Sequence, residues 1–451
     1  MTEAELRAAQ ELIEFIEACP SAFHTAATAC ARLEAAGFTR LCEGDAWEVA
    51  PGGCYFVERN GSSVIAFAVG AHAAEPDRFH FQLAAAHGDS PTFKLKAAPE
   101  LGGEAGYRRL SVEAYGGMLD YTWFDRPLSI AGRVLVRTGA AQRTDAPAGV
   151  ESRLIAPDHD LALIPSLAIH LDHGQNKAFS PNRTRDLFPL ISAGELDEGA
   201  FVELIAREAG VAATDVLGFD LFLVNRVPGR VWGAANEFVS APRIDDLMCA
   251  FTSLRAFLAA RNEAAVRVWC CFDNEEVGSN TKQGAMSTFL PDTLARLAAA
   301  LGRTPEEYRR ALAKSMLVSC DNAHAVHPNR PDACDPSNRC RMNGGIVVKE
   351  AANQHYCTDA FSRAVFTAIC ERAGVPVQAY ANRSDMAGGS TLGNLSNIQA
   401  SMHGVDVGCA QLAMHSAYET AGARDVLLAE RALRAFFEAD LRIDGAHTAA
   451  L

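Results

Sequence analysis

Apolar residues recur at helical spacing from the start of the chain. They stand three or four positions apart, at Leu6, Ala9, Ile13 and Ile16. This spacing predicts an amphipathic helix. Thr2, followed by Glu5 three residues later, is typical of a capping box at the helix start. A second helix is predicted from residue 23 to residue 36, with Gly37 ending it.

Strand-like runs follow these helices. Residues 55–59 and 64–69 are two such runs on either side of Asn60 and Gly61. An Asn-Gly pair between runs of this kind favours a β-hairpin with a type I′ turn. Further along, helical periodicity and continuous apolar runs alternate: helices are predicted at 247–260 and 293–301, and a buried strand at 266–272. This alternation predicts an α/β fold.

The middle of the chain has a different pattern. Short β-like runs, among them 128–136 and 220–224, are separated there by Gly, Pro and Asp turns. We therefore predict a β-rich domain at residues 93–231, inserted into an α/β domain formed by residues 1–92 and 232–451.

Charge narrows the range of partners. The 451 residues include 41 Lys and Arg against 55 Asp and Glu, a formal net charge of −14. A field of this sign repels phosphates, so we expect no binding to nucleic acid or to an anionic membrane. A small or peptidic partner is the better expectation.

The chain also lacks the usual marks of export. Its first residues show neither a basic segment nor an apolar core of a signal peptide, and no apolar run is long enough to cross a bilayer. The 13 cysteines form no C-x-x-C motif, and their odd number fits reduced thiols. These features predict a soluble, cytoplasmic protein.

Three apolar runs end on polar residues that can bind metals. Residues 79–86 lead into His87, residues 266–272 lead into an acidic turn, and residues 315–320 lead into Asp321. Ligands of open α/β sheets bind beyond the carboxyl ends of the strands. We therefore expect these three ends to converge on one crevice.

Two of these ends suggest particular chemistry. In the His87-x-Asp89 triplet, the carboxylate can orient an imidazole that binds a metal, although a surface turn would show the same triplet. Glu275 and Glu276 place two like charges side by side. One carboxylate can then bind a metal while the other acts as general base, and a solvated acidic turn is the alternative.

Other candidates are ambiguous from the residues alone. Asp245 and Asp246 precede a predicted helix, so either can cap it, or one can bridge two metal ions. His415 is a lone histidine in a stretch expected to be helical, 412–418, and the pattern alone does not select it. The glycine-rich residues 387–393 lack the Gly-Lys-Ser/Thr ending of a phosphate loop, so nucleotide binding is not expected.

Taken together, these motifs resemble those of the aspartyl aminopeptidase family of two-zinc peptidases. The motifs that carry the resemblance occur in the family's order: Ala86–Pro91, Pro242–Leu247, Asp273–Ser279, Asp321–Asn329 and Ala413–Ser416. The likeness continues in Asn60–Phe67, Ile164–His170 and Asn353–Tyr356. It covers nearly the whole chain.

The resemblance implies roles for particular residues. It makes His87 and Asp321 ligands of one metal, Glu276 and His415 ligands of the other, and Asp245 the bridge between them. Asp89 then orients His87, and Glu275 is the general base. The positions that the family places around the substrate are Lys349, His170, His324 and Tyr356, with His170 reaching a neighbouring subunit.

The resemblance also implies an architecture. It predicts a three-layer αβα catalytic domain with a mixed sheet, an inserted β-rich dimerisation or lid domain, and a tetrahedral homododecamer. Three residues depart from the family pattern: Asp246 where Asn is usual, His355 where Arg is usual, and Asn394 where Pro is usual.

The expected activity is that of a metallo-aminopeptidase with two Zn²⁺ per subunit, which Mn²⁺ or Co²⁺ can replace. A hydroxide held between the metals, with Glu275 as base, would release N-terminal Asp or Glu from peptides. The alternatives are a preference for neutral N-terminal residues, a related deacylase or dipeptidase, and a catalytically silent assembly protein.

Overall fold

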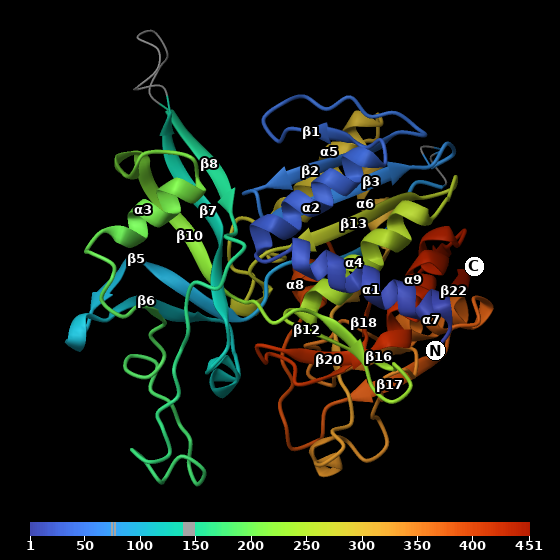
Figure 1. The fold of residues 1–451 in the computed structure, drawn as a ribbon. Coiled ribbons are helices and arrows are strands. Elements are labelled where there is room, and N and C mark those ends of the chain that lie inside the picture. Colours follow the sequence, from blue (N-terminus) through green and yellow to red (C-terminus); the bar gives the residue numbers. More distant parts are fainter. Residues whose placement is uncertain (74, 76–77, 139–148) are drawn as a thin grey trace. The chain divides into compact units, whose positions relative to one another are not determined.

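The computed structural model describes residues 1–73, 75, 78–138 and 149–451, which form two compact units (Figure 1). The first unit comprises Met1–Asp89, Gly229–Met414 and Glu419–Leu451. The second comprises Ser90–Pro228 and the short segment His415–Tyr418.

A nine-stranded mixed sheet forms the centre of the first unit. Its strands, in spatial order, are β1 (Thr39–Leu41), β2 (Cys54–Arg59), β3 (Ser63–Val69), β13 (Val266–Phe272), β4 (Phe81–His87), β14 (Met316–Cys320), β18 (His403–Gly408), β16 (Ile346–Glu350) and β17 (Val377–Ala381). The central strands β13, β4, β14 and β18 run parallel, whereas β3 and β16 run antiparallel to their neighbours β13 and β18.

Helices cover both faces of this sheet. One face packs against α1 (Glu3–Ala18), α2 (Ala22–Ala35), α4 (Ile244–Ala259), α7 (Ala360–Arg372) and α9 (Ala423–Glu438). The other face packs against α5 (Phe289–Ala300), α6 (Pro305–Ala313) and α8 (Leu392–Gln399). The alternation of side chains along β4 explains why both faces are covered. Ala84 and Ala86 point into the first core and Leu83 and Ala85 into the second, as the two-residue period of a strand requires. The predicted three-layer αβα arrangement is therefore confirmed.

Smaller elements complete the first unit. A five-stranded sheet contains β11 (Arg230–Trp232), β12 (Phe238–Ala241), β20 (Glu419–Gly422), β19 (Ala410–Leu412) and β15 (Ala323–His324). Strands β21 (Arg442–Asp444) and β22 (Thr448–Ala450) form a hairpin. Two 3₁₀ turns, η4 (Glu275–Val277) and η5 (Pro331–Ala333), also belong to this unit.

The second unit is rich in β-structure. Its six-stranded antiparallel sheet contains, in spatial order, β8 (Gly149–Ile155), β7 (Leu128–Thr138), β10 (Val216–Asn225), β5 (Thr92–Gly102), β6 (Arg108–Tyr115) and β9 (Leu190–Ser192). It also has α3 (Ala200–Glu208) and the 3₁₀ turns η1 (Glu104–Gly106), η2 (Asp120–Trp123) and η3 (Ala213–Asp215). Its core includes Phe93, Trp123 and Phe201.

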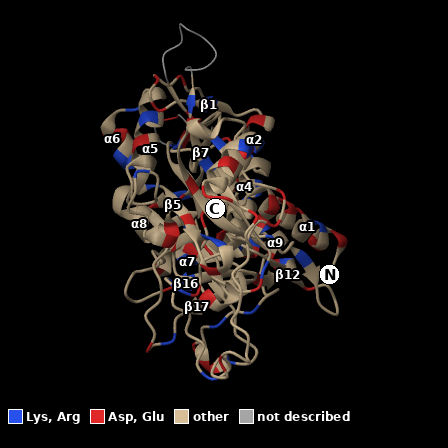
Figure 2. Ribbon diagram, turned by 60° about the vertical axis from the view of Figure 1, so that its left-hand side comes forward, with Lys and Arg blue, Asp and Glu red and all other residues tan. Residues whose placement is uncertain are grey.

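The surface helices of the first unit carry mixed charge. Figure 2 shows basic and acidic residues on both α5 and α6, as expected for helices that face water. No helix among the described residues is long and apolar enough to span a membrane.

Several local predictions are confirmed. The Thr2 hydroxyl accepts the Glu5 amide and the Glu5 carboxylate accepts the Thr2 amide, so the capping box is complete. Asn60 and Gly61 have φ values of 63° and 71°, as a type I′ turn requires.

The prediction of a helix at residues 412–418, around His415, is wrong. After β19 the backbone turns, and Ala413 and His415 adopt positive φ values of 56° and 66°. The backbone carbonyl of His415 accepts the Leu119 amide at 3.0 Å, and the Ala417 amide donates to Thr122 Oγ1 at 2.9 Å. These contacts with residues distant in sequence replace the local hydrogen bonds of a helix.

Candidate metal centre

The three polar strand ends meet at one edge of the central sheet. β4 lies between β13 and β14 and runs parallel to both. Phe272, the last residue of β13, pairs with His87, and the Gly88 amide donates to the Phe272 carbonyl at 2.8 Å. The predicted convergence of these ends is therefore confirmed.

His87 presents one ring nitrogen to a group of carboxylates. Its Nδ1 lies 3.1 Å from the backbone carbonyl of Asp89 and 3.4 Å from the Asp89 carboxylate. Its Nε2 lies 3.6 Å from Asp245 Oδ1 and 4.0 Å from Glu275 Oε2. Asp89 therefore occupies Nδ1, and Nε2 is the nitrogen placed to bind a metal.

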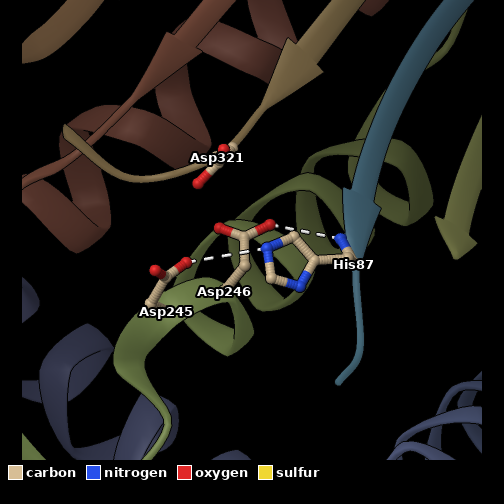
Figure 3. A group of neighbouring side chains, drawn as sticks. All are labelled: His87, Asp245, Asp246 and Asp321. Carbon is tan, nitrogen blue, oxygen red and sulfur yellow. Dashed lines mark hydrogen bonds and ion pairs between the residues drawn. The ribbon is translucent and has the colours of Figure 1, made fainter. Parts of the chain in front are cut away.

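The two aspartates that open α4 lie next to this imidazole. Asp245 and Asp246 have non-helical dihedral angles, with ψ values of 111° and 23°, so the regular helix begins after them. The Asp245 amide donates to Glu419 Oε2 at 2.9 Å. Asp246 Oδ2 accepts the His87 amide at 3.2 Å (Figure 3). The Asp246 carboxylate therefore bonds to the end of β4 rather than capping its own helix.

Asp321 completes a group of four potential ligands. It directly follows β14, and its amide donates to the Val407 carbonyl at 2.9 Å. His87, Asp245, Asp246 and Asp321 each offer one ligand atom, and these atoms all lie within 4.8 Å of one another (Figure 3). All four residues are buried.

Glu275 and Glu276 form a second group with His87. They lie on the turn η4, and one ligand atom from each of the three residues lies within 4.8 Å of the others. Their backbone amides both donate to the Asp89 carboxylate, each at 3.2 Å. Asp89 thus contacts the imidazole and also holds the acidic turn in place.

Burial and neighbouring charges raise the pKa values of the carboxyl groups and of the imidazole in this site. Burial raises the pKa of Glu275 to about 8, and it raises the pKa values of Asp246 and Glu276 well above their ordinary range. Burial opposes protonation of His87, yet Asp246 and Asp89 raise its pKa well above the ordinary value. Buried carboxylates this close together require a proton or a cation for neutralisation.

The donor set fits divalent metal ions. One imidazole with several carboxylates suits Zn²⁺, Mn²⁺ or Co²⁺, and no cysteine belongs to the metal-competent groups found among the described residues. Asp246 Oδ1 is buried, and no hydrogen bond to it is found among the residues that the structure describes. Such an oxygen is satisfied when a cation lies within reach.

Lys349 is buried beside Asp321. Only 1% of it is exposed, and its Nζ lies 3.4 Å from Asp321 Oδ2. The ammonium also donates to the Asn322 carbonyl at 3.3 Å and lies 5.0 Å from the centre of the Tyr356 ring. Burial disfavours the charged amine, but Asp321 raises the pKa of Lys349 above its ordinary value.

The remaining predicted residues lie in different surroundings. His324 is exposed at the end of β15, and Tyr356 is buried. His170 is exposed in a turn of the second unit. His415 also belongs to the second unit, where its Nδ1 bonds to the Gly117 carbonyl.

Sequence reasoning missed a buried polar chain behind Asp245. Asn322 Nδ2 donates to the Ile244 carbonyl at 3.1 Å and to Gln411 Oε1 at 2.9 Å. Gln411 Nε2 in turn donates to Glu419 Oε1 at 3.4 Å, and Glu419 accepts the Asp245 amide. The peptide between Ile244 and Asp245 is therefore held at both its carbonyl and its amide. Of these three side chains, only Asn322 lies within a motif recognised in the sequence, because it follows Asp321; Gln411 and Glu419 lie in none of those motifs.

Known proteins resemble this chain over nearly its whole length. Residues 15–437 match the family described as "Aminopeptidase I zinc metalloprotease (M18)". A "Probable M18 family aminopeptidase 2" of Clostridium novyi (strain NT) is 39% identical over 436 residues, which cover 96% of this chain and 99% of the relative.

Solved structures agree with this assignment. The structure described as "Cryo-EM structure of the Ape4 and Nbr1 complex" has a TM-score of 0.91 and 34% identity, covering 97% of this chain and 87% of that one. The mApe1 dodecamer of S. cerevisiae has a TM-score of 0.82 and 27% identity, covering 95% of this chain and 96% of that one. Together with the family match, these likenesses show that the chain belongs to the M18 family of zinc metallo-aminopeptidases.

Proposed function

We propose that this protein is an aminopeptidase that uses two metal ions to release N-terminal Asp or Glu from peptides. The observation that carries the proposal is the group formed by His87, Asp245, Asp246 and Asp321, with Glu275 beside the imidazole. A metal-competent cluster with a neighbouring carboxylate is the arrangement that metal-assisted hydrolysis needs.

The proposed ligand sets share one carboxylate. His87 and Asp321 would hold the first ion, Glu276 and His415 would hold the second, and Asp245 would be shared by both. For the first set, the 3.6 Å between His87 Nε2 and Asp245 Oδ1 supports this assignment. For His415, the assignment is supported by its closeness along the chain to Glu419. It lies four residues before Glu419, whose carboxylate binds the Asp245 amide, and four residues span at most about 14 Å.

Glu275 is the proposed proton carrier. Its Oε2 lies 4.0 Å from His87 Nε2, so the carboxylate stands beside the proposed metal ligands, where it can exchange a proton with water. It would accept a proton from the attacking water and return it to the leaving amine. Bound Zn²⁺ ions supply the Lewis acidity that polarises the peptide carbonyl and lowers the pKa of water.

Lys349 supports the preference for an acidic N-terminal residue. In a chain of net charge −14 an acidic peptide needs a local cation, and Lys349 is a buried cation next to Asp321. We place Tyr356 and His324 around the substrate because the Tyr356 ring packs near the Lys349 ammonium and His324 is exposed.

The assembly proposed for this chain is a homododecamer in which residues 93–231 act as the dimerisation or lid domain. It is supported by the name of the yeast mApe1 dodecamer and by exposed apolar residues in the second unit. These residues flank His170, which we propose reaches a neighbouring subunit: Leu167, Ile169, Leu171 and Phe179. Light scattering that finds twelve chains per particle would support the assembly, and a monomer would contradict it.

A pair of peptides tests the activity. Both have the same sequence beginning with Asp, but one is acetylated at its amino terminus. An aminopeptidase releases Asp from the free peptide and leaves the acetylated one intact. Cleavage of the acetylated peptide would instead favour a related deacylase or dipeptidase, and release of Leu but not Asp from matched peptides would show a neutral preference.

A further inference from the structure

Asp246 has an oxygen that its structural contacts do not use. The residue is completely buried, and its Oδ2 accepts the His87 amide at 3.2 Å. Its other oxygen, Oδ1, has no hydrogen-bond partner among the residues that the structure describes. Burying a carboxylate oxygen without a partner is costly, so this atom calls for a cation or a proton.

The hydrogen bond to His87 does not itself require a carboxylate. An asparagine at position 246 could accept the same amide through its carbonyl oxygen. The negative charge of Asp246 is therefore not needed to hold the end of β4 in place, and it calls for another explanation.

The neighbours of Asp246 indicate what this charge meets. Its ligand atom lies within 4.8 Å of ligand atoms of His87, Asp245 and Asp321 (Figure 3). The nearby ammonium of Lys349 pairs with Asp321. An ion at the proposed His87 and Asp321 site would lie close to the Asp246 carboxylate, whose Oδ1 has no hydrogen bond among the described residues.

We propose that Asp246 is an additional ligand of the metal ion held by His87 and Asp321. The inference rests on the proposed two-metal function and deepens it. The first site then has one imidazole and three carboxylates, whereas the second has Asp245, Glu276 and one histidine. Because carboxylates suit Mn²⁺ well and added ligand charge raises affinity, the first site binds more tightly and tolerates Mn²⁺ better.

Metal titration of the chelator-stripped full-length protein tests this inference. Isothermal titration with Mn²⁺ and with Zn²⁺ compares the wild type with Asp246→Asn. We expect the first equivalent to bind at least about tenfold more weakly in the variant. The loss should be larger for Mn²⁺ than for Zn²⁺, with a smaller change at the second equivalent.

A matched control is Asp425→Asn. Asp425 is another buried carboxylate of the first unit, and it accepts the amides of Asn343 and Gly345 at 2.5 and 2.9 Å. It does not belong to the metal-competent groups of the described residues, so its variant should bind both metals like the wild type. Circular dichroism verifies folding. If Asp246→Asn is unfolded, Asp246→Ser removes the carboxylate with a smaller polar side chain and should show the same loss.

The outcomes separate this inference from the proposed function. Unchanged affinity at the first equivalent in a folded Asp246 variant overturns the inference but leaves the two-metal function standing. A wild-type protein that binds neither metal overturns both. Weaker first-site binding in the Asp246 variants, with Asp425→Asn unaffected, supports the added ligand whether or not peptides are hydrolysed.

Discussion

The Asp89 carboxylate accepts the backbone amide of Glu275 at 3.2 Å, while the Asp89 carbonyl lies 3.1 Å from His87 Nδ1. One residue therefore ties the end of β4 to the acidic turn after β13. If Glu275 is the base and His87 a ligand, Asp89 fixes the distance between them.

This relationship predicts the effect of Asp89→Asn. The amide side chain keeps one acceptor oxygen and loses the other, so the turn that carries Glu275 is held less firmly. We expect kcat/KM to fall by about 10- to 100-fold, as for other residues that support metal ligands. Steady-state kinetics together with the bound metal content check this prediction. Wild-type activity in the variant would show that Asp89 does not position the site.

Glu275→Gln tests the proton carrier. The glutamine keeps the shape and backbone contacts of the turn but cannot take up a proton. We expect the variant to keep its metal and to lose about 10²- to 10⁴-fold in kcat. Kinetics and elemental analysis on the same sample measure both quantities. A matched control is Glu350→Gln, which removes an exposed carboxylate paired with Arg363. Unchanged turnover in Glu275→Gln would reject Glu275 as the base.

Lys349→Met separates two roles for the buried ammonium. If Lys349 attracts the substrate side chain, the variant loses kcat/KM on N-terminal Asp and Glu and much less on Leu. If it serves only to neutralise Asp321, all substrates lose activity alike. We expect the selective loss. A uniform loss would remove Lys349 from the substrate pocket.

Asp425 gives the protein a pH-dependent stability away from the metal site. Burial raises its pKa from 3.8 to about 7, although the amides of Gly345 and Asn343 oppose this rise. The folded protein binds this proton more tightly than the unfolded chain does. Proton binding therefore stabilises the folded state most below the unfolded pKa, and this contribution is lost as the pH rises from about 4 to 7. Urea unfolding should therefore show the wild type losing more stability than Asp425→Asn between pH 5 and about 7. Equal losses would contradict this assignment.

Much of the fold was predictable because local signals agreed with the tertiary structure. The apolar run 266–272 is β13, buried throughout, and Gly37 follows the end of α2 with a φ of 85°. The meeting of His87 and Asp321 followed from a general rule about the ends of parallel strands.

Other features depend on contacts that leave no trace in a local pattern. The segment around His415 turns because its backbone bonds to Leu119 and Thr122, residues almost 300 positions away. The sequence left open whether Asp246 caps a helix or binds a metal, because no local pattern shows that its carboxylate lies close to His87, Asp245 and Asp321. The pairing of Lys349 with Asp321 likewise depends on the strand order β14-β18-β16, because Lys349 lies on β16 and Asp321 follows β14.

The most direct test of the account is the hydrolysis of unblocked Asp, Glu, Leu and Lys aminoacyl substrates. The protein is first stripped with a chelator and then reloaded with Zn²⁺, Mn²⁺ or Co²⁺. We predict that stripping abolishes turnover and that metal restores it, with Asp and Glu released fastest. Restored turnover of Leu alone would overturn the acidic preference, and no turnover with any of the metals would contradict the proposed catalytic centre.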